Sequence, residues 1–157
     1  MRINCIDVSD LADQHLRAEW LEFLMVGPYV RRSLKSKKGI SFSNSTRYVL
    51  GTGHARFFYD KLGYVENRYK QIEHEMHARG FKTNPNLELS DLPKNLFNSW
   101  TPTKDDKILN LNRIIARISD KPKWYKFKNA QMEDWVDFYE KRYDFTYNYD
   151  IIHYGKK

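Results

Sequence analysis

The sequence predicts an all-α fold with three long helices, a shorter fourth helix and little or no sheet. In three long segments, apolar residues recur at the helical spacings of three and four. Residues that start or stop helices bound each of these segments. A chain of 157 residues with 41% apolar content can build one core but hardly two, so we expect a single domain.

The first long helix is predicted near residues 9–34. Ser9 is a suitable N-cap, and the aspartates in the following turn favour the positive end of the helix dipole. Gly27 and Pro28 are expected either to kink this helix or to end it. Its apolar side is predicted to carry Leu11, Leu16, Trp20, Phe23 and Leu24.

After a polar loop, the stretch 54–62 predicts a short helix that buries its phenylalanines and leaves Arg56 and Lys61 at the surface. The second long helix is predicted over 64–79 and is closed by Gly80 as a C-cap. Its amphipathic stripe consists of Val65, Tyr69, Ile72 and Met76.

The third long helix is predicted over 103–120, because Thr103–Asp106 fits the capping-box pattern and Pro122 stops the helix. Its buried stripe is expected to contain Ile108, Leu111, Ile115 and Ile118.

A fourth helix would follow Asn129 as its N-cap, and an aromatic, polar tail would close the chain. We therefore divide the chain into a main domain, 1–128, and a C-terminal helical extension, 129–157, that packs on the same domain.

The charge balance favours a polyanionic partner. Lys and Arg number 27 against 20 Asp and Glu, a formal net charge of +7. Nucleic acid fits this charge, although acidic membranes or acidic proteins fit it as well. Aromatic residues make up 15% of the chain and could stack on bases as well as fill a core.

Cys5 is the only cysteine, which excludes an intramolecular disulfide and a multi-cysteine zinc site and favours a reducing, cytosolic compartment. No run of about 18 apolar residues occurs, so neither a signal peptide nor a membrane span is expected.

Three polar residues of the first helix, His15, Glu19 and Glu22, share one face, with Gln14 beside them. Their spacing alone is compatible with a solvated stripe or with a functional site. Only two residues of ligand type, His15 and Glu19, converge locally, and no HExxH motif is present. We therefore predict no metal and no other cofactor.

Four blocks of sequence, in order, resemble the pyrimidine-dimer glycosylases of the phage endonuclease V family. The similarity extends from the N-terminus to about Phe127 and leaves the last thirty or so residues uncovered. The blocks are Met1–Asn4 with Val8–Leu16 and Ala18-Glu19, then Leu50-Gly51 with Gly53-His54 and Phe57–Leu62, then Arg79–Phe81, and finally Pro122 with Trp124–Lys126.

The resemblance implies a compact three-helix fold whose N-terminal segment threads between helices towards a DNA-facing surface. It also implies base excision combined with strand cleavage on double-stranded DNA that carries a base lesion. Glu22 takes the place of the family's catalytic glutamate. The family's nucleophile is a threonine amine freed by loss of the initiator Met. This chain has one residue fewer before its Arg-Ile-Asn sequence, so the amine of a retained Met1 is expected at the position of the family's threonine amine. We expect a monomer.

The resemblance, together with the basic charge, implies that the following basic, polar and aromatic residues bind the DNA: Arg2, Gln14, His15, Arg31, Arg113, Arg117, Trp124, Tyr125 and Lys126. The family prototype has arginines on the first helix where this chain has Leu21 and Met25, so specificity for a thymine dimer is open. Two alternatives therefore remain: a glycosylase/lyase for another damaged or modified base, and a non-catalytic DNA-binding protein of the same fold.

Overall fold

The computed structural model describes residues 2–40, 47–84 and 86–149. Within this part of the chain the regular elements are five α-helices and two 3-10 turns; pairing between extended segments is limited to two isolated β-bridges. The prediction of an all-α fold is confirmed. The chain forms two compact units, a first unit of residues 1–4 and 15–101 and a second unit of residues 5–14 and 102–157.

Helix α1 spans Asp13–Lys35 and begins later than predicted. Ser9 is not its N-cap, because Val8–Asp10 forms a separate 3-10 turn and Leu11 is extended, with φ of −76° and ψ of 142°. The helix continues through Pro28 instead of ending there.

The stretch after the first loop contains less helix than predicted. Helix α2 covers only His54–Phe57, and α3 begins at Leu62 and ends at Ala78. Lys61 does not stay at the surface, since its side chain is 17% exposed and its ammonium group lies 3.9 Å from the centre of the Phe57 ring. Burial of the aliphatic stem and the cation–π contact explain this difference.

The predicted C-cap of α3 is confirmed in its geometry. Gly80 has a positive φ of 85°, which glycine adopts without steric strain. Its N–H donates to His77 O over 3.0 Å, and the N–H of Phe81 donates to Met76 O over 2.8 Å. This pair of bonds is a Schellman motif.

In the second unit, α4 spans Lys104–Asp120 and starts with the predicted capping box between Thr103 and Asp106. Helix α5 spans Trp135–Tyr143 and packs against α4. The prediction that Asn129 is the N-cap of α5 is wrong, because Asn129 lies in a left-handed turn with φ of 66°. Asp134 caps the helix instead, accepting the Asp137 N–H over 3.0 Å.

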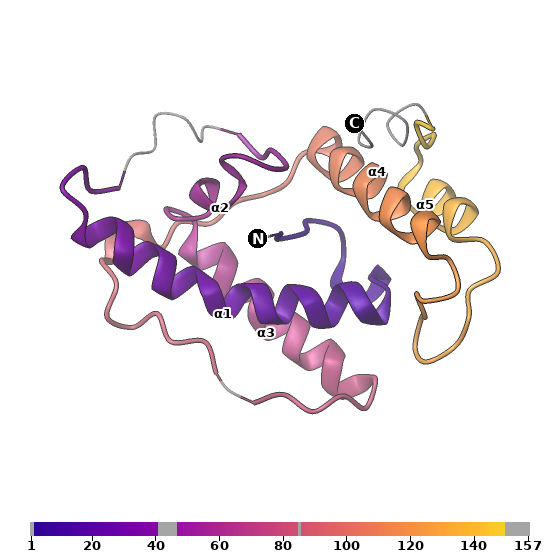
Figure 1. Cartoon of the computed structure of the whole chain (residues 1–157), viewed down its shortest axis with the longest axis horizontal. Coiled ribbons are helices and arrows are strands. Elements are labelled where there is room, and N and C mark those ends of the chain that lie inside the picture. The colour runs from indigo at the N-terminus through magenta and orange to yellow at the C-terminus, as the bar shows by residue number, and fades with distance from the viewer. Residues whose placement is uncertain (1, 41–46, 85, 150–157) are drawn as a thin grey trace. The chain divides into compact units, whose positions relative to one another are not determined.

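Each unit has its own buried side chains. In the first unit α3 lies against α1 (Figure 1), where the Phe23 and Tyr69 rings meet edge to face with centroids 6.4 Å apart. The buried stripe of α3 is the predicted one, together with Leu62 and Arg68. The core of the second unit contains Cys5, Ile6, Val8, Leu11, Ala12, Leu111, Ile114, Ile115, Ile118, Trp135, Tyr139 and Tyr147.

None of the helices in the described part of the chain combines the length and the hydropathy needed to cross a bilayer.

Candidate active site

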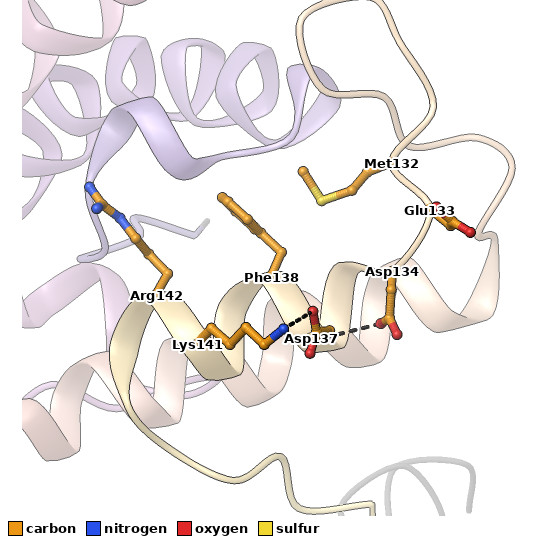
Figure 2. A pocket seen from close by; sticks show the side chains of 7 residues that line it. All are labelled: Met132, Glu133, Asp134, Asp137, Phe138, Lys141 and Arg142. Atoms are coloured by element: carbon orange, nitrogen blue, oxygen red, sulfur yellow. Dashed lines mark hydrogen bonds and ion pairs between the residues drawn. The ribbon is translucent and has the colours of Figure 1, made fainter.

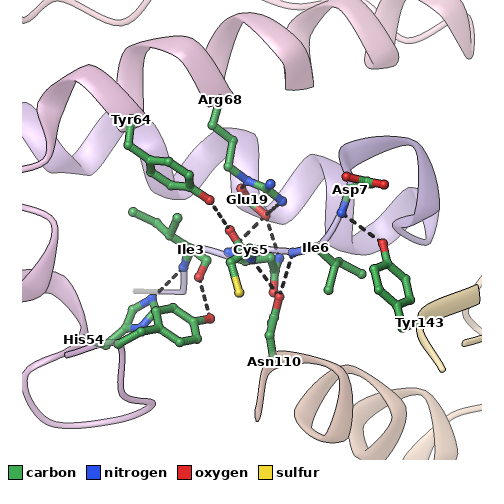
Figure 3. A network of polar contacts seen from close by, with 12 residues as sticks. Ile3, Cys5, Ile6, Asp7, Glu19, His54, Tyr64, Arg68, Asn110 and Tyr143 are labelled. Carbon is green, nitrogen blue, oxygen red and sulfur yellow. Dashed lines mark hydrogen bonds and ion pairs between the residues drawn. The ribbon is translucent and has the colours of Figure 1, made fainter. Parts of the chain in front are cut away.

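The first unit binds the backbone of Ile3 with two aromatic side chains (Figure 3). The Ile3 N–H donates to His54 Nε2 over 2.7 Å, and the Ile3 carbonyl accepts from the Tyr48 hydroxyl over 2.9 Å. Ile3, Tyr48 and His54 are at most 3% exposed, so both bonds are shielded from water. Ile3 is therefore held at both of its backbone polar groups by side chains far away in sequence.

Asn4 is bound in the same way. Its N–H and its side-chain amide both donate to Glu19 Oε1, over 3.2 and 2.7 Å, and its carbonyl accepts from the Tyr64 hydroxyl over 3.1 Å. Arg68 of α3 completes the site by donating to Glu19 through Nε at 2.5 Å and through Nη2 at 3.2 Å. We call the side chains of Tyr48, His54, Tyr64, Glu19 and Arg68 the N-terminal clamp.

Glu19 and Arg68 form a fully desolvated ion pair, with side chains 0% and 6% exposed. Two charges taken out of water are tolerated only when the geometry is good and the remaining lone pairs are hydrogen-bonded. The fork of the guanidinium and the amide of Asn4 supply both conditions. Glu19 is therefore a structural carboxylate, and its oxygens are already used within the clamp.

The ring of His54 has one possible protonation state in this arrangement. Ile3 N–H can only donate, so Nε2 must carry a lone pair. The Val49 carbonyl, 2.7 Å from Nδ1, can only accept, so Nδ1 must carry the proton. Burial lowers the pKa of His54, and the positive charge of Arg2 lowers it further against the opposing effect of the Val49 carbonyl. The imidazole is neutral.

Local sequence places His54 at this point. Gly51 and Gly53 both adopt positive φ, 85° and 89°, and the His54 N–H donates to Gly51 O over 3.1 Å. A tight turn with two left-handed residues separated by one position is easily made by glycine and is strained for most other residues. The glycines therefore aim the imidazole at the N-terminal segment.

Glu22 lies one turn after Glu19 on α1 and is half-buried. The partner that we predict for it, the amine of Met1, lies outside the described residues. Arg2 is exposed, and His15 is half-buried at the start of α1.

In the second unit, the first two residues of α1 hold the loop after α4. Gln14 donates to Trp124 O over 2.8 Å and accepts from Lys126 N over 2.9 Å. The carboxylate of Asp13 accepts from the N–H groups of Lys128 and Asn129 at 3.0 and 2.8 Å. The amide of Gln14 thus fixes the loop backbone, a role that sequence reasoning did not assign to it.

This loop presents polar and aromatic side chains to solvent. Trp124 is 63% exposed, and Lys126 is exposed as well. Tyr125 is half-buried; burial raises its pKa, which the charge of nearby Arg117 lowers in part. Arg117 is exposed on α4, and Arg113 is half-buried one turn earlier. The structure thus brings Arg117 close to Tyr125.

Arg31 has a partner within the first unit. Its Nε and Nη2 donate to the two carboxylate oxygens of Asp91 at 2.8 and 2.7 Å. Its predicted contact with DNA would have to compete with this bidentate ion pair.

A separate pocket of about 860 Å³ lies along α5 in the second unit (Figure 2). Two of its acids already have partners: Asp134 caps the helix, and Asp137 forms an ion pair of 3.0 Å with Lys141. The pocket is lined by Met132, Glu133, Asp134, Asp137, Phe138, Lys141 and Arg142.

The sequence model of a protein family described as pyrimidine dimer DNA glycosylase matches residues 1–89 of the chain. This match covers more than half of the sequence. The chain belongs to the pyrimidine dimer DNA glycosylase family. Within the match lie the N-terminal segment, Glu22 and every member of the N-terminal clamp.

Membership of the pyrimidine dimer DNA glycosylase family makes DNA the substrate and base excision the class of activity. The first three blocks of resemblance lie inside the matched residues. The fourth block, Trp124–Lys126, lies beyond residue 89, so the roles of that loop towards DNA remain predictions.

The sequence pointed to Glu22 and Glu19, but it did not predict that Glu19 and the other clamp residues bind the N-terminal segment. Tyr48, Tyr64 and Arg68 have no motif of their own, because each contacts the N-terminal segment only after folding. His54 follows a Gly-x-Gly turn and was noticed only within a block of similarity. That turn was the one local signal that could have identified the residue.

Proposed function

We propose that this protein is a DNA glycosylase with AP lyase activity that excises a cyclobutane pyrimidine dimer and then cleaves the strand. Its nucleophile is the α-amine of Met1, and Glu22 is its partner. The observation that carries the proposal is the family match over residues 1–89, which includes both residues. The buried hydrogen bonds of Ile3 and Asn4 support it, because a nucleophile at the end of a chain must be attached to a fixed segment of backbone.

The amine is suited to the reaction without unusual activation. An α-amino group has an ordinary pKa of about 7.7–8.0, against about 10.4 for lysine, so a useful fraction is neutral near pH 7. Its lone pair attacks C1′ of the damaged nucleotide. The N–C1′ bond forms while the glycosidic bond breaks, and the base leaves with the bonding electrons and takes up a proton.

Opening of the sugar ring then breaks the C1′–O4′ bond and gives a protonated Schiff base. Loss of a proton from C2′ expels the 3′ phosphate and cleaves the strand. Water hydrolyses the remaining imine and returns the free amine. Glu22 would stabilise the cationic sugar and carry the protons between these steps.

Binding would rely on the basic and aromatic side chains. The predicted phosphate contacts, Arg113, Arg117 and Lys126 among them, would make affinity fall steeply with salt. Extrusion of a nucleotide requires a few kcal/mol of binding energy, to which the exposed indole of Trp124 could contribute by stacking.

The test is borohydride trapping on a duplex with a single cyclobutane dimer. Reduction of the imine should give a covalent protein–DNA complex whose modified peptide contains the N-terminus by mass spectrometry. Glu22→Gln should bind the duplex with unchanged salt dependence and leave both glycosidic bonds of the dimer and the strand intact. An N-terminal extension that is not removed should stop trapping and leave binding intact. A complex linked through a lysine side chain would refute the assignment to Met1.

A second candidate is excision of another lesion by the same chemistry. Leu21 and Met25 are 57% and 44% exposed on α1, on the helix that carries Glu22. Apolar side chains would contact an uncharged base or sugar more favourably than a phosphate. A panel of duplexes with different damaged bases, compared with the dimer at equal enzyme concentration, decides between the two.

A further inference from the structure

Four backbone groups in succession, the N–H and C=O of Ile3 and of Asn4, are bound by side chains of the N-terminal clamp. In a helix or sheet, backbone partners would satisfy such groups, and a side-chain substitution would leave them unchanged. Here each bond ends on one replaceable side chain. The position of this segment can therefore be perturbed one bond at a time.

His54 holds the first of these groups, and it does so in one protonation state. The donor Ile3 N–H and the acceptor Val49 carbonyl fix Nε2 as acceptor and Nδ1 as donor. A proton on Nε2 would place two N–H groups against each other at 2.7 Å. The charged imidazolium therefore cannot keep the bond to Ile3.

We propose that His54 is a positioning residue for the N-terminal nucleophile: its neutral imidazole anchors Ile3 so that the amine two residues earlier keeps one direction. This inference rests on the proposed function. Two residues of extended chain reach about 7 Å. Without the anchor, the distance between the amine and C1′ of the sugar could therefore exceed the roughly 3–3.5 Å needed for attack. Misplacement by about 1 Å alone can reduce a rate about 100-fold.

The groups that surround the ring define the expected pH response. Arg2, on the N-terminal segment, opposes protonation of the ring, and the Tyr48 phenol makes an edge contact with it at 5.5 Å. Arg56, on the same short helix, is exposed. The α-amino group titrates as well, so the reaction should lose rate at low pH for two reasons: protonation of the amine and release of Ile3 by His54.

The experiment measures single-turnover strand cleavage and borohydride trapping from pH 5 to 8, alongside affinity for the same duplex. His54→Leu removes the acceptor and should lower both rates about 10- to 100-fold at pH 7, with affinity unchanged within about threefold. His54→Gln keeps a side-chain oxygen acceptor that does not titrate. It should retain the pH 7 rate within about threefold and lose rate less steeply below pH 6.5.

His74→Leu is the matched control, since His74 is an exposed histidine on α3. It should leave rate, affinity and pH profile unchanged. Wild-type rates in His54→Leu, in a protein that traps normally, would overturn the positioning role while leaving the proposed function intact. A wild-type protein that forms no trapped complex would overturn the proposed function and the positioning role together.

The ring state can be read directly if His54→Leu does not fold. Long-range ¹H–¹⁵N correlation spectra of the wild-type protein at pH 7 should show the His54 proton on Nδ1 and a lone pair on Nε2. The Ile3 amide resonance should shift as His54 titrates. A proton on Nε2 at pH 7, or an Ile3 amide that is indifferent to the titration, would overturn the proposal.

Discussion

The two units bind neighbouring parts of the N-terminal segment with different chemistry. In the first unit the N–H groups of Ile3 and Asn4 donate to ionisable side chains, His54 and Glu19. In the second unit the N–H groups of Cys5 and Ile6 donate to one neutral amide, Asn110, at 2.8 and 3.3 Å. All these acceptors are at most 2% exposed.

The two kinds of acceptor differ in how their hydrogen bonds respond to pH. A neutral amide holds the backbone equally well at every pH, which suits a purely structural contact. An imidazole nitrogen accepts such a bond only while it is unprotonated, and a buried carboxylate needs a compensating charge, which Arg68 supplies to Glu19. The ionisable acceptors occur in the part of the segment closest to the proposed nucleophile.

The largest effect is expected from Arg68→Met. It leaves the carboxylate of Glu19 buried and uncompensated, with the hydrogen bonds from Asn4 in place, so the free energy of unfolding should fall by about 3–5 kcal/mol. Urea denaturation followed by circular dichroism measures this. The double variant Glu19→Gln with Arg68→Met should recover part of the loss. A loss below about 1 kcal/mol would show that the pair does not anchor the first unit.

A smaller loss is expected from Asn110→Leu in the second unit. Two buried N–H groups lose their acceptor, at about 1–3 kcal/mol for each group left unsatisfied, and the 3.3 Å bond of Ile6 is the weaker of the two. The loss should be the same at pH 5.5 and pH 8, because no charge is involved. Asn67→Ala, at an exposed position of α3, is the control and should change stability by less than about 0.5 kcal/mol. A strongly pH-dependent loss in Asn110→Leu would contradict the comparison.

Thr103→Ala should have a still smaller effect, about 1 kcal/mol, because it removes one half of the capping box of α4. The Asp106 N–H, which donates to the Thr103 hydroxyl over 3.1 Å, would then turn to water. Thermal unfolding measures the change, and Thr103→Ser should restore most of it. Equal stability of the alanine and serine variants would show that the cap contributes nothing.

The smallest effect at pH 7 is expected from His54→Gln, since both side chains accept from Ile3 there. The folded-state pKa of His54 is lowered, so below its unfolded value of about 6.5 the unfolded chain binds more protons. Wild-type stability should therefore fall as pH decreases below about 6.5, and the glutamine variant should fall less. Parallel curves of unfolding free energy against pH would exclude a neutral His54 in the folded state.

The helices that could be predicted are those defined by local pattern. The stripe of α3, the left-handed Gly80 and the capping box at Thr103 are encoded within a turn or two of sequence, and all three are confirmed. The errors concern residues whose surroundings are distant. Asn129 reads as an N-cap, but its N–H donates to Asp13, 116 positions away, and its backbone is left-handed.

The candidate site shows the same division. Family resemblance pointed to the N-terminal segment and to Glu22, and the family match over residues 1–89 confirms the family from sequence alone. The partners of the segment could not be predicted in this way. Tyr48 lies 45 positions from Ile3, Tyr64 lies 60 positions from Asn4, and Arg68 lies 49 positions from Glu19. None of the three carries a local sequence signature.

Glu19 and Glu22 separate what the sequence determined from what the tertiary structure decided. Both are glutamates on one face of the same predicted helix, and helical periodicity is a local property that the sequence specifies fully. Burial is not local, because it depends on which other elements cover that face. Only the folded chain sets Glu19 in the clamp with Arg68 and Asn4, and leaves Glu22 half-buried one turn further along α1.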